Sequence, residues 1–141
     1  MASAQAQELF NAALEFAKQM LSEHKGFHPF AVSMDPNGKV AIVAGDIGSE
    51  HPSPTDLTTF LQSALRDQAK AGTIQAAGVC LDVRVTPPGS KDKSDAICVR
   101  VATVKGEAIE VYVPYRKPLI GSHKYGDTFA TAGQAFVLHG A

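Results

Sequence analysis

The stretch that decides the fold is "VCLDVRVTPPGSKDKSDAICVRVATVKGEAIEVYV", residues 79–113. Apolar and other side chains alternate along three parts of it, as they do in strands, where successive side chains point to opposite faces of a sheet. The alternating apolar positions are Val79, Leu81, Val83, Val85, Ile97, Val99, Val101, Ile109, Val111 and Val113. A polar loop and a turn around Lys105-Gly106 separate the parts. The pattern predicts a three-stranded antiparallel meander with one apolar face.

The expected register of this meander follows from the requirement that apolar side chains of neighbouring strands share a face. One register that satisfies it sets Asp82 beside Arg100 and Arg100 beside Glu110, which makes a charge ladder on the outer face. The simpler interpretation is ordinary cross-strand pairing, which contributes little in water. The alternative interpretation is a polar recognition surface that also uses Arg84 and Tyr112.

A hairpin is predicted upstream, in "FHPFAVSMDPNGKVAIVAGD", residues 27–46. Pro36-Asn37-Gly38 suits a three-residue loop, because proline presets the turn and glycine supplies a positive φ. The resulting register sets Asp35 opposite Lys39, Met34 opposite Val40, Val32 opposite Ile42 and Phe30 opposite Ala44. A calcium loop is excluded, because the stretch lacks the third acidic position and the distal glutamate of such a site.

Two segments carry the helical period. Residues 5–24 place apolar side chains on one broad stripe, and a second helix starts at Ser53, a suitable N-cap, with Pro54 in the first helical position. Gly72 marks the end of the second helix. Its apolar stripe comprises Leu57, Phe60, Leu61, Ala64, Leu65 and Ala69.

These elements predict an α+β fold with the order α-β-β-α-β-β-β. We expect an antiparallel sheet of five or six strands with two helices on one face. In element order the chain resembles the roadblock and profilin-like small domains, whose members serve mostly as scaffolding, dimerising or ligand-sensing modules. The resemblance rests on no shared sequence motif, so no functional residue is transferred from those families.

Composition narrows the class of protein. The 141 residues fit a single domain spanning 1–141, with 45% apolar and 19% charged residues and a net charge of -1. Such a balance gives no basic footprint for nucleic acid or for a membrane surface. No leader and no run of roughly 20 apolar residues is present, so we expect a cytoplasmic protein. Cys80 and Cys98 have no metal or redox spacing and are expected to be reduced structural thiols.

The tail from about residue 115 breaks the regular pattern and is expected to be an irregular C-terminal extension. Its last apolar run, 135–138, predicts a final strand at a sheet edge. Since an apolar run near a terminus needs burial, the sequence favours a homodimer.

Histidines are the first candidates for chemistry, because they titrate near neutral pH and bind metals. Extending the hairpin register places His28 opposite Asp46, and His24 and His51 lie close by in sequence. These groups are predicted to meet at the open end of the first hairpin. No spacing fixes two ligands on one element, so no metal and no cofactor is expected; each His-Pro pair is explained more simply by the extended geometry that proline imposes.

A second candidate is the cationic cluster of the tail. Arg116, Lys117, His123 and Lys124 flank two tyrosines, and a folded-back loop would let them hold a carboxylate or phosphate group. Their simpler interpretation is solvated charge around a surface loop. Neither a nucleophile elbow nor a phosphate-binding glycine loop is present in the sequence.

The sequence therefore favours a non-catalytic protein-interaction or ligand-sensing module that acts as a homodimer, with another protein as a second candidate partner. The alternative is a small hydrolase or metal-assisted enzyme built on His24, His28, Asp46 and His51. Convergence of those four side chains on one concavity would distinguish the enzyme from the module.

Overall fold

The computed structural model describes residues 3–24, 26–44, 53–133 and 136. It confirms an α+β fold with an antiparallel sheet, and the first seven elements follow the predicted order. The elements are α1 (Ala4–Glu23), β1 (Phe30–Met34), β2 (Val40–Ala44), α2 (Pro54–Lys70), β3 (Ala76–Val85), β4 (Ser94–Thr103), β5 (Ala108–Arg116), β6 (Lys124–Tyr125) and β7 (Phe129–Ala132). Neither described helix combines the length and hydrophobicity that crossing a bilayer requires.

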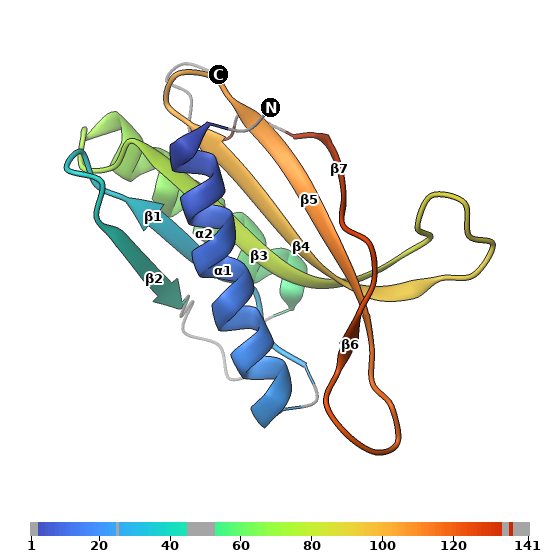
Figure 1. Cartoon of the computed structure of the whole chain (residues 1–141). Coiled ribbons are helices and arrows are strands. Elements are labelled where there is room, and N and C mark those ends of the chain that lie inside the picture. The colour runs from blue at the N-terminus through green and yellow to red at the C-terminus, as the bar shows by residue number, and fades with distance from the viewer. Residues whose placement is uncertain (1–2, 25, 45–52, 134–135, 137–141) are drawn as a thin grey trace.

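The sheet contains seven strands, in the order β2-β1-β3-β4-β5-β6, and β7 also pairs with β5 (Figure 1). It exceeds the expected five or six strands because the tail beyond residue 115 returns along β5 as two short strands. Of the predicted last strand, 135–138, only Phe136 is described; it is buried and lies in a turn. The other residues of that segment lie outside the described part of the chain.

The first hairpin has the predicted register, with Met34 opposite Val40 and Val32 opposite Ile42. Asp35 N–H donates to the Lys39 carbonyl at 2.9 Å, and the Asp35 carboxylate accepts from Asn37 N–H at 2.9 Å. Gly38 takes the positive φ that the turn requires, 87°. Local turn chemistry therefore sets this part of the sheet.

Helix boundaries also follow local chemistry. Ser53 Oγ accepts a hydrogen bond from Asp56 N–H at 3.0 Å, Pro54 occupies the first turn of α2, and Gly72 follows the helix with φ 78°. The N-cap of α1 is Ser3, which accepts from Ala6 N–H at 3.2 Å. These caps satisfy backbone donors that the first helical turn leaves unpaired.

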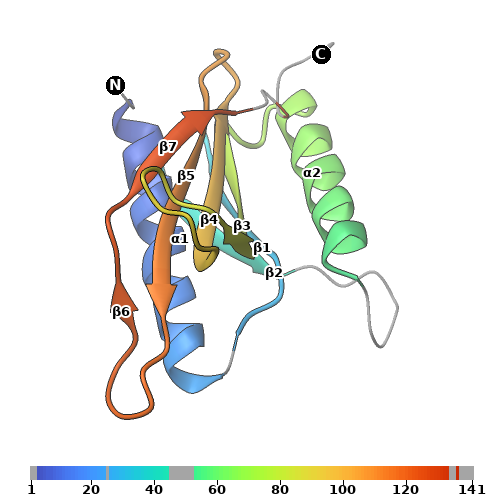
Figure 2. The same cartoon turned by 90° about the vertical axis from the view of Figure 1, so that its right-hand side faces the viewer.

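The prediction that both helices lie on one face of the sheet is wrong. They cover opposite faces. Figure 1 shows α1 in front of the strands, and Figure 2 shows the sheet between α1 and α2. The α1 side buries Leu9, Ala13, Ala17 and Leu21 with Phe30, Val32, Cys80, Val99 and Val113. The α2 side buries Leu57, Leu61, Leu65 and Ala69 with Ala31, Ala77, Val79, Leu81 and Cys98.

The register between β3 and β4 also differs from the prediction. Asp82 lies opposite Ile97, and Arg100 lies opposite Val79, so Asp82 and Arg100 are not paired. The pairing of Arg100 with Glu110 between β4 and β5 is confirmed. The prediction assumed that only one face is apolar. Because a helix covers each face, residues of both parities are buried, and the requirement for matched apolar positions no longer selects a register.

Candidate functional site

The structure describes two of the four residues of the predicted histidine and carboxylate cluster. His24 is exposed as the C-cap of α1, and His28 is exposed just before β1. Asp46 and His51 lie outside the described residues. Within the described ranges, no group of three or more His, Cys, Asp and Glu side chains could hold a metal ion.

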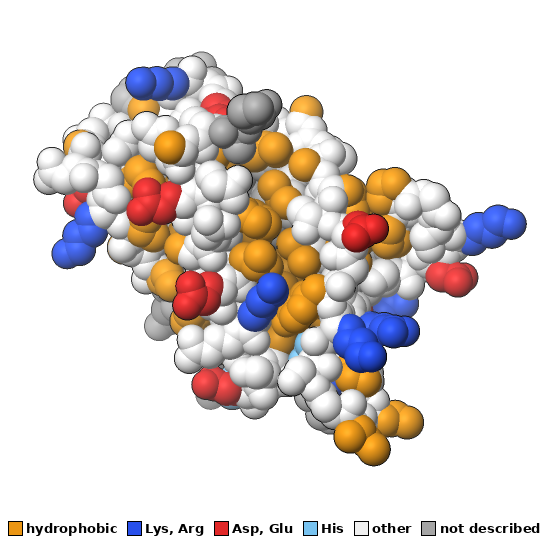
Figure 3. All heavy atoms as spheres, in the orientation of Figure 1, with side chains coloured by type: hydrophobic (Ala, Val, Ile, Leu, Met, Phe, Trp, Pro, Cys, Tyr) orange, Lys and Arg blue, Asp and Glu red, His pale blue; other side chains and the backbone are white. Residues whose placement is uncertain are grey.

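The predicted tail cations lie on the β5–β6 hairpin, beside a loop that projects from the body (Figure 3). Arg116 lies directly opposite Lys124 in the β5–β6 pairing. Lys117 and His123 line a cavity of about 510 Å³ against the C-terminal end of α1, where His24 also lies. The structure thus brings His24 to the tail cluster, a proximity that the sequence analysis did not predict.

Two of the residues that line this cavity, His123 and Tyr125, have aromatic rings. The rings of Tyr115 and His123 lie 5.8 Å apart, and the Lys18 ammonium lies 4.3 Å from the centre of the Tyr125 ring. His123 Nε2 is buried and has no hydrogen-bond partner among the described residues. These contacts anchor the base of the β5–β6 hairpin to α1, so they hold its connecting loop in place.

The predicted recognition surface of Arg84, Arg100 and Tyr112 is wrong as a single surface. Arg84 belongs to the α1 side of the sheet, where it pairs with Asp95 at 3.1 Å. Arg100 and Tyr112 belong to the α2 side, because they neighbour Cys98 and Glu110 on that face. This separation follows from the pairing of β3 with β4, in which Arg100 lies opposite Val79 and Arg84 lies opposite Asp95.

Arg100 and Tyr112 take part in a polar network beside α2. Arg100 Nε lies 2.7 Å from Glu110 Oε1, and Arg100 also donates to Gln62 of α2 at 3.4 Å. The Tyr112 ring stacks on Phe129 with centroids 5.0 Å apart. Burial, reinforced by the neighbouring Cys98, raises the Tyr112 pKa to about 12, so the phenol stays protonated at neutral pH. The network holds these side chains between α2 and the meander. Glu110 is paired with Arg100 and Tyr112 is protonated, so neither is available as a general base.

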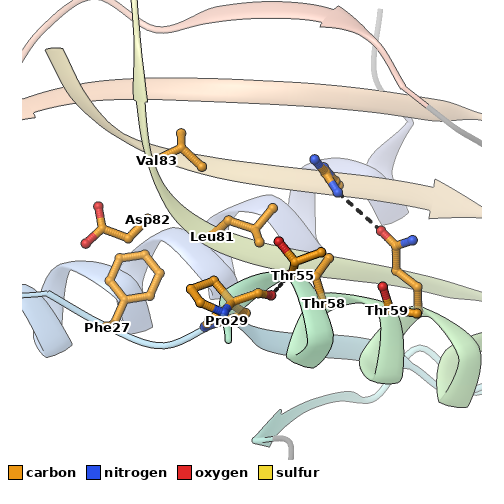
Figure 4. Close-up of a pocket in the computed structure, with 11 residues that line it drawn as sticks. Phe27, Pro29, Thr55, Thr58, Thr59, Leu81, Asp82 and Val83 are labelled. Atoms are coloured by element: carbon orange, nitrogen blue, oxygen red, sulfur yellow. Dashed lines mark hydrogen bonds between the residues drawn. The ribbon is translucent and has the colours of Figure 1, made fainter. Parts of the chain in front are cut away.

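A cleft of about 360 Å³ lies where α2 begins, between that helix and β3 (Figure 4). Figure 4 shows Thr55, Thr58 and Thr59 on the helix side, with Leu81 facing them and Asp82 beside Phe27 at one end. Burial raises the Asp82 pKa, although the Tyr115 hydroxyl donates to its carboxylate at 2.6 Å. The cleft offers threonine hydroxyls, the Gln62 amide, the Arg100 guanidinium and one carboxylate that is already engaged. None of its described lining residues is an activated nucleophile.

The carboxylate of Asp82 also explains why a glycine, Gly26, lies in the loop after α1. A Cβ at Gly26 would lie 2.9 Å from Asp82 Oδ2, closer than real Cβ contacts. Burial raises the Tyr115 pKa, and the hydrogen bond to Asp82 raises it further. The Tyr115–Asp82 pair therefore acts as a structural contact that ties β5 to β3 and to the loop after α1.

One edge of the sheet is formed by β2, which the sequence predicts only as part of a hairpin. Ile42 and Val43 are 45% and 36% exposed, and their side chains point to opposite faces. The strand, "VAIVA", carries no charged residue. The uncharged apolar run is visible in the sequence, but its position at an edge, where such a strand is unusual, is not.

The two cysteines lie on neighbouring strands but on opposite faces, and both are free and buried. The prediction that no disulfide joins them is confirmed. Burial raises the Cys98 pKa to about 11 and the Cys80 pKa well above its ordinary value. Neither thiol is suited to nucleophilic chemistry, which requires the thiolate.

We expect both thiols to be unreactive in the folded protein. At pH 8, Ellman's reagent should label the native chain at least about a hundredfold more slowly than the chain in guanidinium, because the thiolate is scarce and access is blocked. The denatured sample is the control and should release two equivalents per chain. Rapid labelling of the native protein would contradict the burial of Cys80 and Cys98.

The chain was compared with known proteins in three ways. No protein-family model, no curated protein and no solved structure shows significant similarity to it.

Proposed function

We propose that this protein is a non-catalytic interaction module that forms a homodimer by pairing β2 with β2 of a second copy. The observation that supports the proposal is that β2 is uncharged and, among the described residues, has no strand partner on its outer side, with exposed apolar side chains on both of its faces. Edge strands that must stay single usually carry lysine, proline or a bulge. Along the five residues of β2 neither lysine nor proline is present.

The hydrogen-bond phase of β2 agrees with this role. Asp35 N–H bonds to Lys39 in the direction of β2, whereas the Met34 carbonyl accepts from Gln75 N–H in the direction of β3. Successive residues of a strand alternate in this way, so Ala41 and Val43 direct their backbone groups to β1. The N–H and C=O groups of Val40, Ile42 and Ala44 therefore point away from the sheet.

Two copies of β2 are self-complementary in an antiparallel arrangement centred on Ile42. Ile42 faces its own copy, and Val40 faces Ala44, so all outward backbone groups are in phase. No like charges are opposed, because all paired residues are apolar. A two-fold axis through the centre closes the assembly at two chains, as an isologous interface requires.

The proposal places the module in the cytoplasm, where two free cysteines remain reduced. The alternative of a hydrolase or metal-assisted enzyme is not proposed. It depends on His24, His28, Asp46 and His51, and no observation on the described residues favours a shared site for them.

A charge at the centre of the edge tests the dimer. Ile42→Lys sets two ammonium groups against each other across the two-fold axis, and like charges in contact cost several kcal/mol, so dimerisation should weaken by about a hundredfold or more. Sedimentation equilibrium measures the mass, which should be that of two chains for the wild type and of one chain for the variant. Far-UV circular dichroism should be unchanged.

The matched control is Phe60→Lys, which places the same charge at a residue of similar exposure, 43%, on α2. This variant should remain dimeric. A wild-type chain that stays monomeric at high concentration, or an Ile42→Lys variant that dimerises as well as the wild type, would refute the proposed function.

A further inference from the structure

The loop between β5 and β6 exposes two large aliphatic side chains almost completely. Leu119 is 105% exposed and Ile120 is 91% exposed, far more than any other exposed large hydrophobic side chain of the described residues. Figure 1 shows this loop extending below the body, and Figure 3 shows hydrophobic side chains projecting there. A scattered half-exposed apolar residue needs no explanation, but two adjacent ones in full contact with water at a protruding tip do.

Cations surround the base of this tip. Arg116 and Lys117 precede it, Lys124 follows it, and all three side chains are exposed. Among the described residues, none of the three has a carboxylate within ion-pair distance, since the ion pairs found there are Arg84–Asp95 and Arg100–Glu110. The positive charge of the hairpin is therefore not neutralised within the described chain.

The pairing within the hairpin adds a second, independent observation. Arg116 and Lys124 are direct cross-strand partners, and like charges in that position are unfavourable. A negatively charged surface in contact with the hairpin would relieve this repulsion. The apolar tip and the cations at its base are therefore complementary to a surface that carries negative charge on its outside and is apolar just beneath.

We propose that the β5–β6 loop inserts Leu119 and Ile120 into the interfacial region of an anionic lipid bilayer, with Arg116, Lys117 and Lys124 at the headgroups. Aliphatic side chains buried at the boundary of the acyl chains and cations attracted to acidic lipids are the two forces that hold peripheral proteins on membranes. Each alone is weak, and here a single hairpin supplies both. The cytoplasmic leaflet carries such acidic lipids.

This inference revises the expectation that the protein contacts no membrane. That expectation relied on a net charge of -1 and on the absence of a spanning segment. Net charge does not describe how charges are distributed, and a surface contact requires no span. The inference is also independent of the dimer, because the hairpin lies at the sheet edge opposite β2.

Flotation of the full chain with lipid vesicles tests the inference. We expect binding to vesicles of phosphatidylcholine mixed with phosphatidylserine and at least about tenfold weaker binding to phosphatidylcholine alone. Leu119→Ser combined with Ile120→Ser should reduce binding at least about tenfold, because the buried apolar area is lost. Since both side chains are fully exposed, the melting temperature of this variant should equal that of the wild type.

A second variant separates the electrostatic contribution. Arg116→Gln combined with Lys124→Gln should weaken binding to the mixed vesicles and flatten its dependence on salt. Phe60→Ser, at an exposed aromatic residue of α2, is the control and should bind as the wild type does.

Two results would overturn the inference. The first is a wild-type chain that does not bind the mixed vesicles at low salt. This would be the result if the tip instead binds an apolar pocket of a protein. The second is binding that the Leu119 and Ile120 variant retains in full. Neither result bears on the mass of the protein in solution, so a failure here is distinguishable from a failure of the proposed dimer.

Discussion

Val79→Asp and Cys80→Asp will each strongly destabilise the fold, although the two residues are neighbours on β3 and point to opposite faces of the sheet. Both side chains are 0% exposed, Val79 against α2 and Cys80 against α1. An unpaired carboxylate in either core is expected to cost more than about 4 kcal/mol. That is a large fraction of the stability of about 5–15 kcal/mol that a typical domain has.

Circular dichroism and guanidinium unfolding of the two variants measure this effect. Ala130→Asp serves as the control, because Ala130 is exposed on β7 and the same charge there should change the free energy of unfolding by less than about 1 kcal/mol. A sheet with one apolar face would tolerate one of the two substitutions on β3. A folded Cys80→Asp variant with the stability of the wild type would therefore contradict the arrangement of α1 and α2 on opposite faces.

Leu61→Ala should lower the free energy of unfolding by about 2–5 kcal/mol, whereas Phe60→Ala, one residue earlier on α2, should lower it by less than about 1 kcal/mol. Leu61 is 2% exposed and packs among residues of β1 and β3. Its truncation removes apolar contacts and leaves a cavity. Phe60 is 43% exposed, so its truncation leaves no enclosed cavity and removes contacts that are partly replaced by water.

Urea unfolding of both variants at one pH measures the difference. The periodicity of α2 alone assigns both residues to the same apolar stripe, so it predicts a larger loss for phenylalanine, the larger side chain. Equal or reversed losses would contradict the position of α2 against the sheet.

Much of the candidate interaction surface could have been predicted from the sequence. The uncharged run of β2 and the Leu119-Ile120 pair between proline and glycine are both visible there. What the sequence does not contain is their environment: that β2 is the outer strand, and that the pair lies at a protruding tip. Sheet order decides which strand is an edge, and sheet order depends on long-range pairing.

The predicted recognition surface failed for a related reason. Arg84 and Arg100 were assigned to one face by assuming a register that matches apolar positions on both strands. A shift of the register by one residue moves every side chain of a strand to the other face. The observed pairing of Val79 with Arg100 therefore separates Arg84 from Arg100.

The sequence by itself determined the helices, the strands of the hairpin and meander, the turn at Gly38 and the caps of α2. Each of these depends on contacts within a few residues, such as the hydrogen bond from Asp56 N–H to Ser53. Only the tertiary structure decided the register of β3 against β4, the opposite placement of α1 and α2 and the return of the tail along β5. These depend on which of the two apolar faces of the sheet each helix covers. Because both faces are buried, the local pattern of apolar residues does not select between them.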